Sequence, residues 1–233
     1  MPVVGGALMG YRLHSAREES RDPVTGLLHR PHFNKWLKRQ LPVLKRNQRI
    51  QAMLAEADQR GNLGIEERLR LLRKISPRRA MVVDADNLKM LNDVFGYPTG
   101  NRYLRAIAAG AQRTHRSYEV VSKLQEGDEF VIGGGPDLDH VAAEAIVKRL
   151  KEPVEQFREE LVAELRREYR GAPASQRREI ARRRLALRKF RPGLSYVLVD
   201  LEPRHVLMNE LETEIRARMH EVKARNREAY RRV

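Results

Sequence analysis

A short apolar run that ends in an acidic residue constrains the fold most: residues 80–84 read AMVVD. A run of this length, rich in β-branched residues, is typical of a strand buried on both faces. Helical patterns lie on either side, at residues 31–60 and 65–75 before the run and near 88–94 and 101–113 after it. We therefore expect a central strand covered by helices, with Asp84 at its end.

A hairpin is expected next along the chain. Residues 119–124 and 129–132 have the composition of strands and flank a turn at residues 126–128. The glycines of 133–136 (GGGP) predict a turn that closes this unit. Residues 194–201 form the last apolar strand, between helical patterns at 138–190 and 206–230. This order predicts an α+β fold, with a mainly antiparallel sheet covered by helices and long helical insertions.

The charge balance points to anionic partners. The chain has 46 Lys and Arg residues against 31 Asp and Glu, a formal charge of +15, which attracts nucleotides, nucleic acids or anionic surfaces. The lack of cysteine excludes disulfides and thiolate metal sites. No segment approaches the roughly 20 apolar residues of a membrane helix, and the short apolar start lacks the basic region of a signal peptide. We expect no membrane association and a cytoplasmic location.

Three acidic residues are candidates for a shared site. Asp84 ends the predicted strand, Asp128 lies in the predicted turn, and Glu129 follows it. If the hairpin pairs beside the first strand, their side chains converge at one edge of the sheet. Converging carboxylates bind magnesium, which bridges phosphate oxygens. Acids at strand ends are more often turn residues or helix caps, so this pattern alone leaves both interpretations open.

Four ordered blocks of sequence carry a resemblance to a known family. They are residues 22–33 (DPVTGLLHRPHF), residues 84–93 (DADNLKMLND) with Gly96 and Gly100, residues 126–130 (EGDEF), and Met219, His220, Lys223 and Arg227 on the closing helix. Together they resemble the GGDEF diguanylate cyclases, as a divergent member with an EGDEF signature. The resemblance implies a palm-like sheet. It also implies condensation of two nucleoside triphosphates, GTP first among them, into a cyclic dinucleotide such as cyclic di-GMP.

The resemblance also implies a role for each matching residue. Asp84, Asp128 and Glu129 would be the catalytic residues. Asp84 and Asp128, with the carbonyl of Ala85, would also hold Mg²⁺ or Mn²⁺. Asn92 would contact the base, and Lys89, Lys223 and Arg227 the triphosphate. The full set of expected substrate-binding residues is Leu88, Lys89, Asn92, Asn101, Gly127, Lys223 and Arg227. Because each half-site holds one substrate, the resemblance implies a homodimer.

Departures from the family pattern leave an alternative open. Glu126 replaces a glycine beside the substrate, and Asn101 stands where the family has an aspartate that contacts guanine, which leaves base preference open. Residues 117–120 (SYEV) occupy the place of the product-inhibition motif, so feedback inhibition there is not expected. The alternative is a catalytically degenerate module for nucleotide binding or protein interaction.

We expect a single domain over residues 1–233, with three additions. These are an N-terminal extension at 1–20, a helical insertion at 38–76 and a basic helical insertion at 156–191. Arginines crowd residues 166–191 with few acids after 172, which is consistent either with a solvated helical face or with phosphate contacts. A palm-like protein that acts with nucleic acid is therefore a further hypothesis, although only Tyr169 and Phe190 are available there for base stacking.

Overall fold

The computed structural model describes residues 21–114, 119–124, 127–189 and 193–231, with residues 189 and 227–231 described by their backbone alone. The elements are, in chain order, α2 (Arg30–Arg60), α3 (Ile65–Leu72), β1 (Arg79–Ala85), α4 (Leu88–Phe95), α5 (Tyr97–Thr114), β2 (Val120–Lys123), β3 (Glu129–Gly134), α6 (His140–Gly171), α7 (Ala174–Lys189), β4 (Leu194–Asp200), the 3₁₀ helix η2 (Pro203–Val206) and α8 (Met208–Arg231). The predicted N-terminal extension at 1–20 lies outside the described residues.

The four strands form one antiparallel sheet in the order β2-β3-β1-β4. The apolar run predicted as a buried strand is β1, which lies between β3 and β4. Residues 80–84 are at most 4% exposed, as expected for a strand with neighbours on both sides and helices on both faces. The mixed α+β prediction with an antiparallel sheet is confirmed.

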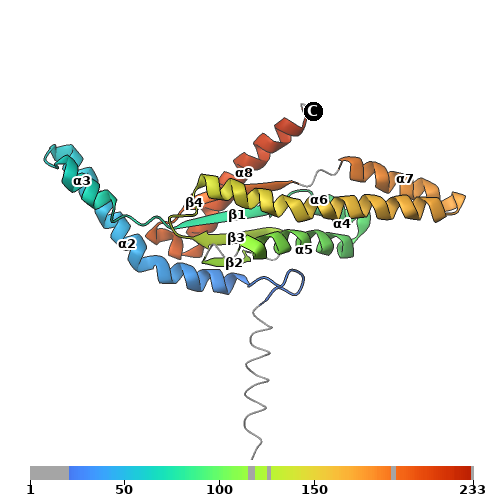
Figure 1. Cartoon of the computed structure of the whole chain (residues 1–233), viewed down its shortest axis with the longest axis horizontal. Helices are drawn as coiled ribbons and strands as arrows, with labels where there is room; N and C mark the ends of the chain where they lie inside the picture. The colour runs from blue at the N-terminus through green and yellow to red at the C-terminus, as the bar shows by residue number, and fades with distance from the viewer. Residues whose placement is uncertain (1–20, 115–118, 125–126, 190–192, 232–233) are drawn as a thin grey trace, which may run out of the picture.

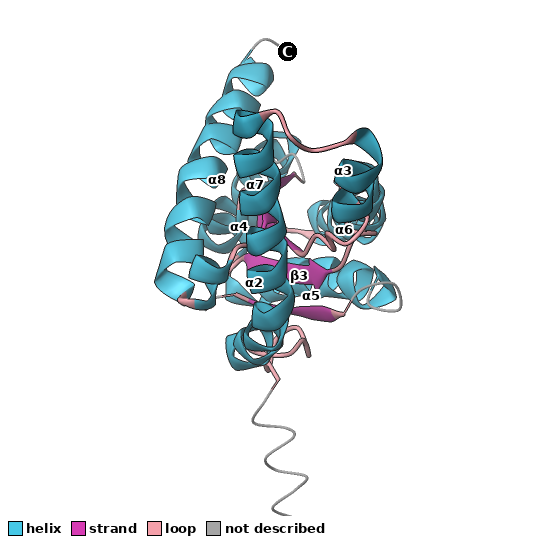
Figure 2. Ribbon diagram, turned by 90° about the vertical axis from the view of Figure 1, so that its left-hand side faces the viewer, coloured by secondary structure: helices cyan, strands magenta, loops and turns pink. Residues whose placement is uncertain are grey.

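Helices cover both faces of the sheet, which gives three layers (Figure 1). Met81 and Val83 of β1 face a cluster built from α4, α5, α6 and α7. Ala80 and Val82 face a second cluster built from α2 and α8. This alternation follows from the two-residue period of a strand. Figure 2, turned by 90°, shows α8 and α6 on opposite sides of the strands. Among the described residues, no helix combines the length and apolar character needed to cross a membrane.

The structure of residues 133–136 differs in part from the prediction. They were expected to form a turn, but Gly133 and Gly134 belong to β3 and pair with Ala80 and Arg79 of β1. A Cβ added at Gly133 would lie 2.6 Å from the ring of Trp36. The indole of Trp36 therefore packs directly on the strand backbone, and its Nε1 donates to Oε2 of Glu119 at 2.8 Å. Glycine is present here for close packing and not for a turn.

Helices α2 and α3 form an arm that leaves the body of the molecule at one end (Figure 1). Gly61 ends α2 in the left-handed conformation, with φ of 62°, and α3 has no buried residue. At the base of the arm, the side chain of Asn47 donates to the carbonyl of Ser76 at 2.8 Å and accepts from its N–H at 3.1 Å. These two bonds attach α2 to the segment that enters β1.

Candidate functional site

The acidic ends of the strands meet at one edge of the sheet. Asp84 pairs with Glu129 of β3 on one side and with Ser195 of β4 on the other. One residue further, the N–H of Ala85 donates to the carbonyl of Asp128 at 3.2 Å. Residues directly opposite each other on paired strands point to the same face, which here is the face covered by α8. The structure thus brings Asp84, Asp128 and Glu129 to one place.

A cavity of about 250 Å³ opens at this edge. Its lining consists of Asp84, Ala85, Asp86, Asn87, Leu88, Lys89, Asp128, Ser195, Lys223 and Asn226. Six of these were expected from the sequence to bind metal or substrate, and they come from β1, α4, the β2–β3 hairpin and α8. Asp86, Asn87, Ser195 and Asn226 were not among the expected residues.

Asp84 is the most buried acid of the cavity, at 4% exposure. Nζ of Lys223 on α8 lies 2.7 Å from its Oδ1. Burial raises the pKa of Asp84 to about 6, the ion pair with Lys223 opposes that rise, and the nearby Asp128 adds to it. Asp84 is therefore a carboxylate that needs a cation, and Lys223 supplies one.

Asp86 forms a chain of hydrogen bonds that the sequence analysis missed. Its Oδ1 accepts from Oγ of Ser195 at 2.8 Å, and that hydroxyl in turn accepts from Nδ2 of Asn226 at 3.2 Å. Oδ2 of Asp86 is buried without a hydrogen-bond partner among the described residues, and burial raises the pKa of this carboxyl. The available signal was spacing, because Asp86 lies two residues after Asp84 and Asn226 three residues after Lys223.

Asn87 explains how the chain turns from β1 into α4. It has φ of 66°, and it is the one non-glycine in the described ranges with positive φ. Asparagine tolerates this left-handed conformation better than most residues. The turn brings the start of α4 over the cavity, so Leu88 and the exposed Lys89 line it.

A divalent cation fits the chemistry of this donor set, although the fit is incomplete. Two carboxylates, the carbonyl of Ala85 and the unpartnered Oδ2 of Asp86 are hard oxygen donors of the kind Mg²⁺ prefers. Within the described ranges, however, no three acidic or histidine side chains lie close enough to hold a metal by themselves. Mg²⁺ is commonly bound by one or two carboxylates together with substrate phosphates. Asp84 and Asp128 match that arrangement.

Lys123 stabilises the hairpin between β2 and β3. It is 3% exposed, and its Nζ donates to the carbonyl of Gly127 and lies 4.8 Å from the ring centre of Phe130. Burial lowers the pKa of Lys123, and the nearby Asp22 and Asp128 oppose that change. The sequence analysis did not single out this residue. Its contact fixes the backbone next to Asp128, where the predicted turn residue Glu126 lies outside the described residues.

The first sequence block, residues 22–33, packs against this hairpin. Asp22 accepts hydrogen bonds from the N–H and the hydroxyl of Thr25, at 2.7 and 2.6 Å. The carbonyl of Leu28 accepts from the N–H of Lys123 at 2.8 Å. This block therefore forms a turn that docks the start of α2 onto β2.

Four of the expected site residues lie off the described lining of the cavity, namely Asn92, Asn101, Gly127 and Glu129. Asn92 packs against the next helix, where a Cβ added at Gly100 would lie 1.8 Å from its Oδ1. Gly127 is exposed with φ of 134°, a conformation that suits glycine. Burial and the neighbouring Asp128 raise the pKa of Glu129. The side chain of Arg227 lies outside the described part of α8.

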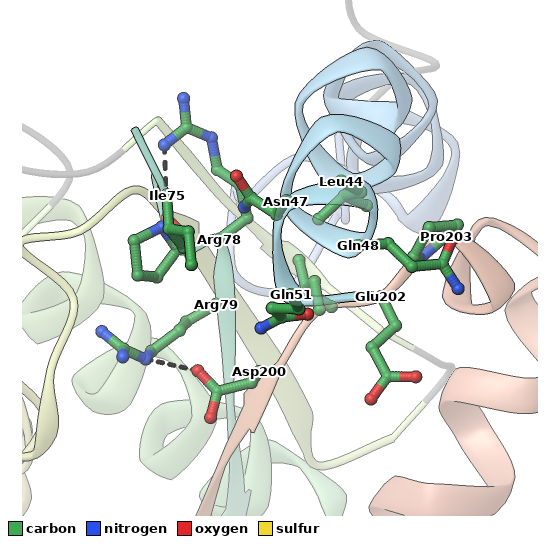
Figure 3. Close-up of a pocket in the computed structure, with 12 residues that line it drawn as sticks. Leu44, Asn47, Gln48, Gln51, Ile75, Arg78, Arg79, Asp200, Glu202 and Pro203 are labelled. Atoms are coloured by element: carbon green, nitrogen blue, oxygen red, sulfur yellow. Dashed lines mark hydrogen bonds and ion pairs between the residues drawn. The ribbon is translucent and has the colours of Figure 1, made fainter. Parts of the chain in front are cut away.

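A larger cavity of about 490 Å³ lies at the other end of β1 and β4, beside the base of the arm (Figure 3). There, Nε of Arg79 lies 2.7 Å from Oδ1 of Asp200. The side chains of Asn47, Gln48 and Gln51 reach this cavity from α2. Positive and negative groups both line this cavity, so its charge does not indicate which class of ligand would bind.

Comparison with known proteins agrees with the resemblance found in the sequence. Residues 62–172 match the model of "Diguanylate cyclase, GGDEF domain". The coiled coil and GGDEF domain of DgcB from Caulobacter crescentus, in complex with c-di-GMP, is 18% identical with a TM-score of 0.52, over 94% of this chain and 87% of that one. The diguanylate cyclase SiaD from Pseudomonas aeruginosa, in complex with its activator SiaC, is 18% identical with a TM-score of 0.48, over 94% of this chain and 64% of that one.

No curated protein sequence matches the chain. The family match covers two of the four sequence blocks, at 84–100 and 126–130, and the fold agrees with that of DgcB. The resemblance is confirmed: residues 62–172 match the GGDEF domain model, and the chain has the fold of the DgcB GGDEF domain.

Proposed function

We propose that this protein is a nucleotidyl cyclase that condenses two nucleoside triphosphates, GTP first among them, into a cyclic dinucleotide such as cyclic di-GMP. The observation that carries the proposal is the cavity at the sheet edge. It joins Asp84 and Asp128, within the matched GGDEF residues, to Lys89 and Lys223. Three acidic and two basic side chains around one cavity suit a triphosphate that arrives with a divalent cation.

The proposed reaction forms one phosphodiester bond per substrate. The 3′ hydroxyl of one nucleotide attacks the α-phosphorus of the other, the bond to the β-phosphate breaks, and pyrophosphate leaves. The hydroxyl proton passes to a carboxylate, for which Glu129 is our candidate because of its place beside Asp128 and its raised pKa. A second, identical step closes the ring.

The side chains have separate roles in this proposal. Asp84, Asp128 and the Ala85 carbonyl would hold Mg²⁺ or Mn²⁺, which neutralises phosphate charge when bound. Lys223 would pass from Asp84 to the triphosphate when the cation arrives, because the two positive groups compete for the same carboxylate. Lys89 and the N-terminus of α4 would contact phosphate oxygens.

We infer that two copies act together. Each cavity has room for part of one substrate, and the product joins two identical halves, so the cavities of two chains must face each other during the reaction. SiaD from Pseudomonas aeruginosa forms a complex with its activator SiaC, and a partner of this kind is a further route by which two copies of this chain would be brought together.

The test is an assay of purified protein with Mg²⁺ or Mn²⁺ and each labelled triphosphate, alone and in pairs, with products resolved by mass. We expect a cyclic or linear dinucleotide that disappears in Asp128→Asn. Asp137→Asn, an exposed acid after β3, should retain activity. The base found in the product identifies the nucleotide that the site accepts with Asn101 at this position.

A degenerate nucleotide-binding module is the second candidate. It is favoured by the absence, within the described residues, of a three-acid metal group and by the neutral Asn101. Nucleotide binding without product under every pairing would select this module. Product formed only when a nucleic acid is added would instead favour the palm-like hypothesis that the 166–191 segment suggested.

A further inference from the structure

Helices α6 and α7 line a further cavity, which shares no described lining residue with the one at the sheet edge. The chain reverses direction at 171–173, so α7 runs back along the second half of α6 (Figure 1). Ile180 and Leu187 of α7 are buried, as are Leu161 and Leu165 of α6. Between the two helices lies a space of about 210 Å³, lined by Arg158, Val162, Leu165, Arg166, Arg184, Leu187 and Arg188.

The lining is entirely arginine and apolar. Its four α6 residues have the spacing i, i+4, i+7 and i+8, and its three α7 residues i, i+3 and i+4, so each set forms one helix face. The lining therefore combines three apolar side chains with four guanidinium groups. The described lining contains no acidic residue.

The nearby acids are paired with other arginines. Glu164 accepts two hydrogen bonds from Arg102, at 2.8 and 2.9 Å, and Glu168 is paired with Arg183 at 3.0 Å. Glu179 lies 3.7 Å from Arg182. These three glutamates therefore do not neutralise the positive charge of the cavity.

Among the arginines of this cavity, Arg158 is the one with a buried hydrogen-bond donor that has no acceptor in the described residues. Its Nε is buried and has no hydrogen-bond partner among the described residues. A buried N–H donor of this kind requires an acceptor. The guanidinium carbon of Arg184 lies 5.3 Å from the ring centre of Tyr169, a cation–π contact. The cavity therefore combines arginine donors with apolar side chains.

We propose that this cavity binds a compact phosphate-bearing anion, of the size of pyrophosphate. Guanidinium groups recognise phosphate oxygens through paired N–H donors, better than lysine does. Cavities for drug-sized ligands measure about 300–1,000 Å³, so this smaller space fits a phosphate or diphosphate group and not a whole nucleoside triphosphate. The proposal does not depend on catalysis at the sheet edge.

The test is calorimetric titration of the full chain with sodium pyrophosphate, without divalent cations. We expect Arg158→Gln and Arg184→Gln each to weaken binding at least about tenfold, because each removes a charge-assisted contact. Arg158→Lys keeps the charge but not the paired donors and should give an intermediate loss. Arg182→Gln changes an exposed arginine off the cavity and should leave binding unchanged. Circular dichroism checks that each variant is folded.

Three results would overturn the proposal. The first is binding no tighter than that of sulfate at equal ionic strength. The second is binding that survives in the Arg158→Gln/Arg184→Gln double variant but is lost in Lys89→Gln, which would place pyrophosphate at the sheet edge. The third is an effect of the arginine variants on a single-stranded oligonucleotide and not on pyrophosphate, which would assign these arginines to nucleic-acid contact.

Discussion

Nζ of Lys223 on α8 lies 2.7 Å from Oδ1 of Asp84 on β1, and both residues line the candidate site. The side chain of Asp84 is 5% exposed and that of Lys223 is 35% exposed. The ion pair therefore joins the last helix to the central strand, at the place where a metal ion would also be attracted.

Replacement of Lys223 tests this competition. Lys223→Met leaves a buried carboxylate without its cation, so we expect the free energy of unfolding to fall by about 1–3 kcal/mol. Millimolar Mg²⁺ should restore part of the loss, and should raise the melting temperature of the variant more than that of the wild type. Lys89→Met, on the exposed wall, is the control. A variant as stable as wild type without Mg²⁺ would contradict the prediction.

Asp22 should make stability depend on pH. Burial tends to raise its pKa, but the two hydrogen bonds from Thr25 and the charge of Lys123 outweigh this, so the folded pKa is lowered from 3.8. A lowered pKa stabilises the fold above the unfolded value, and the gain is lost as pH falls through the folded pKa. We expect Asp22→Ala to cost about 1–2 kcal/mol at neutral pH. In urea titrations stepped below pH 3.8, the difference from wild type should shrink. A constant difference would refute this, and Asp137→Ala is the control.

The contact between Trp36 and Gly133 should make even a methyl group unfavourable. Gly133→Ala would place Cβ 2.6 Å from the indole, and overpacking of this kind costs about 1–3 kcal/mol. Trp36→Leu should reduce that cost, so the two changes should be non-additive in urea unfolding. Gly64→Ala is the matched control, because a Cβ there meets no atom within 4 Å. Additive effects would mean that the strain lies elsewhere.

Asn92 and Gly100 should be coupled in the same way. A Cβ at Gly100 would lie 1.8 Å from Oδ1 of Asn92, so Gly100→Ala alone should destabilise the fold. The double change with Asn92→Ala removes the clash and also the buried Oδ1, which has no hydrogen-bond partner in the described part of the chain. Alanine is favoured over glycine in a helix by about 0.5–1 kcal/mol. The double variant should therefore recover the stability of wild type or exceed it, as thermal melts would show.

The strands and their neighbours were predictable because their signals are local. The apolar run at 80–84 and the two halves of the hairpin specify strands within a few residues. The four sequence blocks then indicated the fold and the acids at its edge. The hydrogen bonds around Asp86 were not predictable in this way, since Ser195 is 109 positions away and Asn226 lies a further 31 beyond it. These partners depend on the placement of β4 and α8.

The turn predicted at residues 133–136 was wrong for Gly133 and Gly134, for a related reason. Glycine and proline clusters usually mark turns, but Gly133 accommodates the ring of Trp36, which comes from a helix about a hundred residues earlier. No local pattern contains that contact. The cavity between α6 and α7 is an intermediate case. The spacing of its arginines was visible in the sequence, but the reversal at 171–173 is what places the two faces opposite each other.

Trp36 is the sole tryptophan of the chain, and its position gives the protein an internal optical probe. Its indole is 8% exposed, lies on the backbone of β3 and donates to Glu119. The same helix continues into the arm that carries α3. A change in the angle of the arm, whether from a partner or from a second copy, would alter the surroundings of the ring. Intrinsic fluorescence should therefore report such a movement without any added label.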